Sequence, residues 1–234
     1  MKTSKLVTFA MCLLIGIGAH ASTKKDSQQV RKVDHFSAVK VSSGIDLYLT
    51  QGSSEEVVIK ADDDIIDDIV TKVKDGVLHI YLERNFNWNW MNSRKAYVIF
   101  DDLTSIDASA GSDVYSENDF KLDDLEIEVS SGSDLDLSGL VTKSLRLGTS
   151  SGSDAKLSGK VEQLEAHASS GSDIDAGSLE SKNCRVRVSS GSDAVVYVTE
   201  SLEADASSGG DVRYRGNPRH KDVHESSGGD VKGY

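Results

Sequence analysis

The sequence predicts an all-β protein: a right-handed parallel β-helix or related solenoid with rungs of about 20 residues and a short helical insertion in its N-terminal part. The pentapeptide Ser-Ser-Gly-Ser-Asp, or a close copy, recurs at a nearly constant interval, and apolar and polar residues alternate on both sides of it. Steps of 18 to 21 residues between successive motif glycines are typical of solenoids. These glycines are Gly111, Gly132, Gly152, Gly171, Gly191, Gly209 and Gly228.

The alternation around each glycine indicates a β-strand. Positions three and five before the glycine, and three after it, are mostly small or apolar, whereas the positions between them are mostly polar. We expect the alternation to continue through the motif, so that Ser131 and Ser133 face inward while Gly132 and Asp134 face outward. Small inward residues would then allow a sharp bend.

Outward-facing charges support parallel stacking of the rungs. Two columns alternate in sign from one repeat to the next, and strands about 4.8 Å apart would place the opposite charges side by side. The columns are Glu126, Arg146, Glu165, Arg185, Glu203 and, on the other side of the motif, Asp136, Lys156, Asp175.

The first 21 residues have the pattern of a secretory signal peptide. A basic start with Lys2 and Lys5 precedes an apolar run over residues 6–17 and a small-residue cleavage pattern at Ala19 and Ala21. We expect cleavage after Ala21, a linker over residues 22–32, no later transmembrane segment, and export to the periplasm, the cell surface or the medium.

Composition limits the class of protein. The net charge of −12 becomes −14 when the segment carrying Lys2 and Lys5 is removed, and such an acidic surface argues against nucleic acid as a partner. A hydrophobic content of 38% with 20 glycines predicts a narrow core of small and β-branched residues. Cys184 would be the one remaining cysteine, so no intrachain disulfide is expected. It lies in an inward column that is normally filled by leucine, as at Leu125, Leu145, Leu164 and Leu202.

Residues 33–102 are expected to form a less regular β part that is continuous with the seven repeats of residues 103–234. An early motif copy has its glycine at Gly44, and residues 56–60, 77–82 and 95–100 read as strands. Asp62, Asp63 and Asp64 precede apolar residues at helical spacing over 65–73, which predicts an acidic N-cap and a short amphipathic helix. In the last repeat, Lys221 and Glu225 fall in inward columns, so this rung should fray or cap the stack.

The chain resembles a known family through this early motif. Ser42-Ser43-Gly44-Ile45-Asp46 is followed by Leu47-x-Leu49-x-Gln51-Gly52, and the later rungs fit the same pattern. Over about residues 33–232 the sequence is similar to the family called putative auto-transporter adhesin, head GIN domain. The name-giving Gly-Ile-Asn occurs here as Gly44-Ile45-Asp46. The resemblance implies an exported β-helical protein of Gram-negative bacteria and supplies no catalytic residues.

A column of aspartates follows the motif glycines. Calcium takes several oxygen ligands and would relieve repulsion between stacked carboxylates, so weak calcium binding is one interpretation. The alternative, which we favour, is that each carboxylate is solvated or accepts hydrogen bonds from its own turn. The column comprises Asp113, Asp134, Asp154, Asp173, Asp193, Asp211 and Asp230.

Both tryptophans lie in one short stretch between two predicted strands. At strand spacing Phe86, Trp88 and Trp90 share one face, which suits a platform for a glycan or peptide. The alternative is that the rings fold down and cover an open end or side of the solenoid.

No residue pattern predicts catalysis. Repeated equivalent aspartates do not supply the two different carboxyl environments that acid–base chemistry needs. His220 and His224, on one face with Asp222, are expected to be a surface pair and not a metal site. We therefore predict a non-enzymatic adhesion or interaction module without a cofactor, which binds a surface glycan or protein. The alternatives are a carbohydrate-active β-helix enzyme and a purely structural protein that stacks through its ends.

Overall fold

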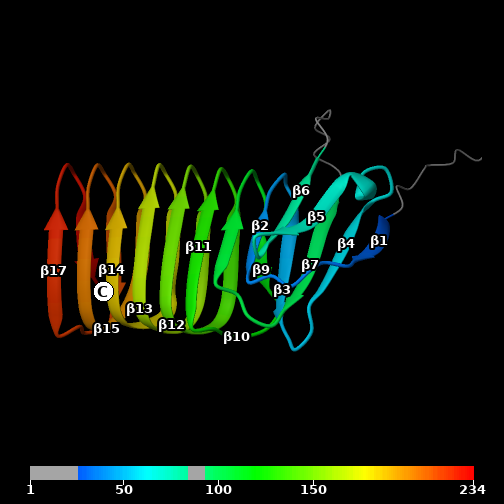
Figure 1. Ribbon diagram of the computed structural model, residues 1–234. Helices are drawn as coiled ribbons and strands as arrows, with labels where there is room; N and C mark the ends of the chain where they lie inside the picture. Colours follow the sequence, from blue (N-terminus) through cyan, green and yellow to red (C-terminus); the bar gives the residue numbers. More distant parts are fainter. Residues whose placement is uncertain (1–25, 84–92) are drawn as a thin grey trace, which may run out of the picture.

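The computed structural model describes residues 26–83 and 93–234, which form one long β-solenoid (Figure 1). The predicted fold class is confirmed: the described residues form eighteen strands joined in one hydrogen-bonded sheet that surrounds a continuous apolar core. Within these residues, no helix has the length and apolar character needed to cross a membrane.

The regular part consists of long strands that pair in parallel with the next rung. Glu126, Arg146 and Glu165 lie in register on successive rungs, as the charge pattern predicted, and Arg146 is 3.6 Å from Glu165. Arg185 and Glu203 approach to 2.6 Å in the same column. These strands are β11 (Asp124–Ser130), β12 (Asp134–Ser150), β13 (Asp154–Ser169), β14 (Asp173–Val188) and β15 (Asp193–Ala206).

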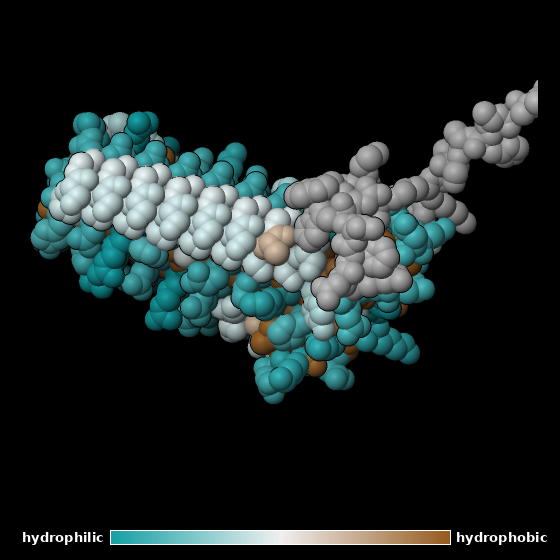
Figure 2. All heavy atoms as spheres, turned by 90° about the horizontal axis from the view of Figure 1, so that it is seen from above, coloured by the Kyte–Doolittle hydropathy of each residue, from teal (hydrophilic) through white to brown (hydrophobic). Residues whose placement is uncertain are grey.

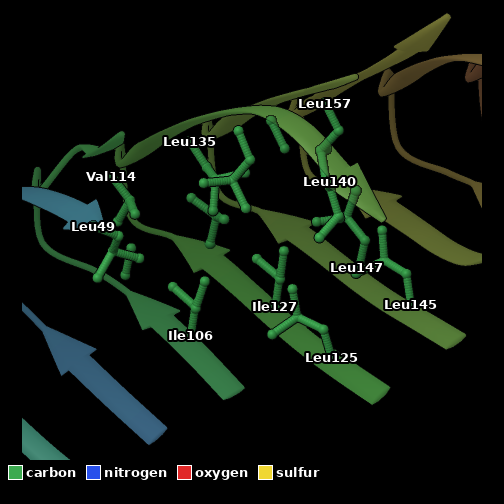
Figure 3. Packing of buried hydrophobic residues seen from close by; sticks show 14 of the residues in the cluster. Leu49, Ile106, Val114, Leu125, Ile127, Leu135, Leu140, Leu145, Leu147 and Leu157 are labelled. Carbon is green, nitrogen blue, oxygen red and sulfur yellow. The ribbon is translucent and has the colours of Figure 1, made fainter. Parts of the chain in front are cut away.

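Each rung is flattened into two layers whose inward side chains meet. Figure 3 shows Ile106 and Ile127 on one layer and Val114 and Leu135 on the other, all pointing into the space between. These side chains are at most 2% exposed, so the narrow core predicted from composition is fully closed to water.

Tight turns along one edge of the solenoid join the two layers. We call this the serine edge; it consists of the repeated Ser-Ser-Gly-Ser turns, which Figure 1 shows as pointed loops at the top and Figure 2 as a pale band. Ser131 and Gly132 both adopt left-handed backbone conformations, with φ of 60° and 68°. The prediction that Ser131 faces inward is therefore wrong: two consecutive left-handed residues turn both away from the core, and Ser131 is exposed while Ser133 is buried.

The opposite edge is less regular. Here each long strand bends, and the rung-to-rung register shifts, for example between Leu137 and Leu140. We call this the lysine edge, because four lysines line it. They are Lys121, Lys143, Lys160 and Lys182.

The N-terminal part combines parallel rungs with antiparallel strands. Parallel pairs join β2 to β8 and β3 to β9, whereas β4 pairs antiparallel with β1 and β7. The strands are β1 (Asp26–Arg31), β2 (Ala38–Val41), β3 (Asp46–Gln51), β4 (Glu56–Asp62), β5 (Ile69–Lys74), β6 (Val77–Leu82), β7 (Arg94–Phe100), β8 (Ser105–Ala108), β9 (Val114–Ser116) and β10 (Phe120–Lys121).

Two expectations for this part need correction. Most of the predicted linker is strand β1, because residues 26–31 hydrogen-bond along β4. The predicted amphipathic helix is a single 3₁₀ turn, Ile66–Asp68, and the N-cap residue before it, Ile65, makes no side-chain capping hydrogen bond. The residues from Ile69 onward extend instead and pair with β6, where strand pairing outweighs a weak helical pattern.

The last rung consists of β17 (His220–Glu225) and β18 (Asp230–Gly233) and follows β16 (Asp211–Arg215). β17 pairs with β15 and β18 with β16, both in parallel. All six residues of β17 are exposed. The rung thus covers the core without being buried itself.

Candidate functional site

The aromatic platform predicted at Phe86, Trp88 and Trp90 lies outside the described residues. The described chain stops at the end of β6 and resumes just before β7. The platform therefore stays a prediction.

The aspartates that follow the motif glycines form a ladder along the serine edge. In the rungs from Asp113 to Asp211, the Oδ1 of each aspartate accepts a hydrogen bond from the backbone N–H of the aspartate on the next rung. The five donor–acceptor distances lie between 3.1 and 3.3 Å. The carboxylate adds an acceptor for a strand-end N–H, and the N–H groups of Asp173 and Asp211 also donate to the backbone carbonyls of Ser153 and Ser192 on the preceding rung, both at 3.2 Å. The acceptors are Asp113, Asp134, Asp154, Asp173 and Asp193.

The hydrogen bonds of the aspartate ladder leave fewer carboxylate oxygens available for a calcium ion. Calcium takes six to eight oxygen ligands, whereas each of these side chains already gives one oxygen to the neighbouring backbone. Over residues 26–83 and 93–234, no group of three or more His, Cys, Asp or Glu side chains is arranged to hold a metal ion.

The other sequence candidates lie apart from one another. His224 Nε2 is 3.4 Å from Asp222 Oδ1 on the exposed strand β17. Cys184 lies in the core, where burial raises the pKa of its thiol to about 12 and keeps it protonated. The structure brings neither group together with the aspartate ladder.

A row of three tyrosines is a surface feature that the sequence reading missed. Tyr48, Tyr97 and Tyr115 lie in register on neighbouring parallel strands β3, β7 and β9. The ring centroids of Tyr48 lie 4.9 Å from Tyr97 and 5.3 Å from Tyr115, with the rings stacked. We call this row the tyrosine ladder. Each of its side chains is half-buried, so the ladder lies on the outer face of the sheet.

Charged groups surround the tyrosine ladder. The ammonium of Lys60 lies 4.6 Å from the ring centre of Tyr97, and that of Lys95 lies 5.5 Å from the ring centre of Tyr48. Burial and the nearby Asp113 raise the pKa of Tyr115 to about 12, so its hydroxyl stays a donor. Because the ring faces cover one another, the ladder offers ring edges, hydroxyls and ammonium groups to a partner.

A shallow depression of about 370 Å³ adjoins the ladder and shares Tyr115 with it. Acidic side chains of three successive rungs line it, together with Lys156. Carboxylates accept hydrogen bonds from hydroxyl groups, and aromatic edges pack on C–H surfaces. The acidic residues are Asp134, Asp136, Asp154, Asp173 and Asp175.

The lysine edge carries a larger groove of about 610 Å³. Its charges mostly compensate across rungs: Lys143 lies 2.8 Å from Asp123, and Lys182 lies 3.1 Å from Glu162. Val141 is 44% exposed within it. The groove therefore combines charges that are paired in part with one exposed apolar side chain.

Comparison with solved structures shows the same fold in three bacterial proteins. A structure described as a putative adhesin from Bacteroides fragilis NCTC 9343 is 24% identical, with a TM-score of 0.85 over 91% of this chain and 98% of that chain. A putative adhesin from Parabacteroides merdae ATCC 43184 is 20% identical (TM-score 0.70, 90% and 96% covered). A putative lipid binding protein from Parabacteroides distasonis ATCC 8503 is 14% identical (TM-score 0.62, 88% and 96% covered).

The comparison with curated proteins found no match. The family model described as putative auto-transporter adhesin, head GIN domain, matches residues 35–218. This range includes the early Gly44-Ile45-Asp46 motif, the tyrosine ladder and the serine-edge turns up to Gly209. The chain therefore belongs to the putative auto-transporter adhesin, head GIN domain family.

Proposed function

We propose that this protein is an exported, non-enzymatic adhesion module that binds a surface glycan or protein in the periplasm or outside the cell. Its family and two structures of the same fold are described as adhesins, which supports the general role. The predicted signal peptide supports export.

The observation that carries this proposal is the tyrosine ladder together with the acidic depression beside it. Both share Tyr115, so hydroxyls, ring edges and carboxylate acceptors form one outer surface across several rungs. Sugar hydroxyls donate to carboxylates, while the C–H faces of a sugar pack on aromatic groups. A linear glycan or an extended peptide fits such a surface better than a small molecule does, because small-molecule sites enclose their ligand.

Binding of the chain from residue 22 to arrays of surface polysaccharides and proteins tests the proposal. We expect binding that weakens at least about tenfold in Tyr115→Ala, because an aromatic contact at the centre of a site costs more than 1 kcal/mol when truncated. Tyr197→Ala is the matched control, since Tyr197 is also half-buried but stacks with Arg215, at 4.2 Å, away from the ladder.

The same binding experiment also tests the predicted platform at Trp88 and Trp90. Binding that persists in Tyr115→Ala but is lost in the pair Trp88→Ala and Trp90→Ala would move the site to that segment. Release of reducing or unsaturated sugar from any bound glycan would replace adhesion with the enzymatic alternative.

A further inference from the structure

The last rung presents two strand edges to the outside. Figure 1 shows β17 at the left-hand end of the stack, with its outer side turned away from the other strands. Among residues 26–83 and 93–234, β17 pairs only with β15, and β18 only with β16. The outward N–H and C=O groups of β17 are therefore open to a further strand, whereas on β18 the N–H of Val231 already donates to Glu225 Oε1 at 2.8 Å.

The inward positions of β17 differ from those of every earlier rung. Lys221 stacks on Leu202, Val223 on Ala204 and Glu225 on Ala206. The underlying residues are at most 1% exposed, whereas β17 itself is exposed throughout. Inward-pointing charges on an edge strand prevent pairing in most registers, because they would be buried without partners.

One arrangement satisfies these charges. Suppose that β17 of a second copy pairs antiparallel with β17, and that the two-fold axis passes between the two Val223 residues. Each residue then lies opposite the residue that is equally far from Val223 in the other direction. Lys221 then faces Glu225 of the other copy twice, once from each side, and Val223 faces its own equivalent. On the outward face Asp222 lies opposite His224 of the other copy. A one-residue slip destroys all of these matches.

The second strand of the rung has the same kind of pattern. Asp230 and Lys232 flank Val231 on β18, and their side chains already pair with each other within the chain. These two charges are already satisfied within the chain, so β17 alone sets the register of an end-to-end pairing.

We propose that two copies of this protein dock end to end through their C-terminal rungs, with β17 pairing antiparallel to β17 about Val223. The contact uses the same surface on both copies, so it closes as a dimer and does not propagate into a fibre. The tyrosine ladder lies on strands β3, β7 and β9, many rungs away, so both copies keep it available. The inference therefore goes beyond the adhesion proposal and does not depend on it.

Sedimentation velocity of the chain from residue 22, over a range of concentrations up to roughly 0.5 mM, tests the dimer. We expect concentration-dependent dimers in the unaltered chain. Lys221→Glu places two acidic residues opposite each other at both symmetric contacts, and Glu225→Lys places two lysines there. Each substitution should raise the dissociation constant at least about tenfold.

Two combinations separate the proposed register from general damage to the last rung. A mixture of the Lys221→Glu and Glu225→Lys chains should form heterodimers, because every contact then joins opposite charges. The double variant, which carries both substitutions, should dimerise about as well as the unaltered chain. Lys32→Glu changes the net charge equally at the other end of the molecule and should leave the dimer intact.

A chain that stays monomeric over the whole range overturns the proposal, as do single variants that dimerise normally. Single variants that weaken the dimer without rescue in the mixture or the double variant overturn the register about Val223. Glycan or protein binding by a Lys221→Glu monomer leaves the adhesion proposal standing whatever the dimer experiment shows.

Discussion

The serine edge and the lysine edge join the same two layers of strands, but with different backbone geometry. Along the serine edge every turn uses two consecutive left-handed residues. From Gly111 to Gly209, the N–H of each turn glycine donates to a serine carbonyl of the next rung, as Gly132 does to Ser151 at 3.2 Å. Along the lysine edge the register shifts from rung to rung, and no single motif returns.

Glycine has a different role on each edge. A Cβ added at Gly152 on the serine edge would meet no atom within 4 Å, so there the left-handed φ of 68° alone selects glycine. A Cβ at Gly159 on the lysine edge would lie 2.0 Å from the carbonyl oxygen of Leu140. Repetition in the sequence thus marks a shared backbone conformation, whereas the irregular glycines mark individual close contacts between rungs.

The largest expected difference in stability between the two edges comes from replacing one glycine on each edge by alanine. Gly159→Ala should lower the free energy of unfolding by about 3 kcal/mol, because its Cβ collides with the Leu140 backbone and φ of 133° disfavours any side chain. Gly152→Ala should cost only about 1 kcal/mol, the penalty for a left-handed alanine. Urea denaturation followed by circular dichroism measures both. Equal losses would contradict the distinction between the edges.

Removing a hydroxyl on each edge should give the next largest difference. The Oγ of Ser153, a buried residue, accepts the N–H of Ser133 at 3.2 Å on the serine edge, so Ser153→Ala leaves that N–H unpaired inside the core. We expect a loss of about 2 kcal/mol.

The matched control is Ser158→Ala on the lysine edge. There the Oγ accepts the N–H of Gly139 at 3.4 Å in a half-buried position that water can reach. We expect a loss below about 1 kcal/mol from this change. If Ser158→Ala proves the more harmful of the two in the same urea titration, the buried serines are not what holds the serine edge together.

The aspartate ladder should contribute less, because it is exposed. Asp154 Oδ1 accepts the N–H of Asp173 at 3.2 Å, and that N–H also donates to the carbonyl of Ser153 at 3.2 Å, so Asp154→Ala should cost no more than about 0.5 kcal/mol. Asp154→Asn keeps an acceptor oxygen and should cost still less. Thermal melts with calcium and with EDTA should coincide. A melting temperature raised by calcium, and no longer raised in Asp154→Ala, would establish the ladder as a cation site instead.

The regular rungs could be predicted from sequence because one physical cause repeats in them. Glu126, Arg146 and Glu165 share a column only if the strands are parallel and in register, so the charge order alone determined the stacking. The position of Ser131 could not be read in this way. The inward–outward alternation of side chains holds only in an extended strand, and two left-handed residues interrupt the strand at this turn.

The tyrosine ladder was missed for a different reason. Tyr48 and Tyr115 each follow a motif glycine by four residues, so the 67-residue step between Gly44 and Gly111 was a usable signal for this pair. Tyr97 follows no motif glycine, and only the pairing of β7 with β3 brings it into the row. The sequence likewise offered helical spacing from Ile65 onward, and only the pairing of β5 with β6 explains the strand found there.

The smallest effect concerns Asp46, which follows the first turn of the serine edge. Burial, and next the nearby Asp113, raise the pKa of the Asp46 carboxyl above its usual value of 3.8, while Lys95 lowers it in part. The ionised carboxylate therefore disfavours the folded state at neutral pH. Asp46→Asn, which restores the asparagine of the family's name-giving motif, should stabilise the protein at pH 7. The gain should stay below about 1 kcal/mol, because the group is partly exposed to solvent.

The pH dependence of the stability gained in Asp46→Asn shows whether the gain comes from removing the charge or from a change in packing or hydrogen bonding. As pH falls through the raised pKa, the folded wild-type protein takes up a proton at Asp46 before the unfolded chain does, so the advantage of asparagine should shrink and vanish below about pH 3.8. Asp136→Asn is the control: Asp136 is exposed and lies opposite Lys156, so its replacement should give no gain at pH 7. Urea midpoints at pH 7 and pH 3.5 measure both variants. A gain of equal size at the two pH values would assign the effect of Asp46→Asn to packing or hydrogen bonding instead of charge.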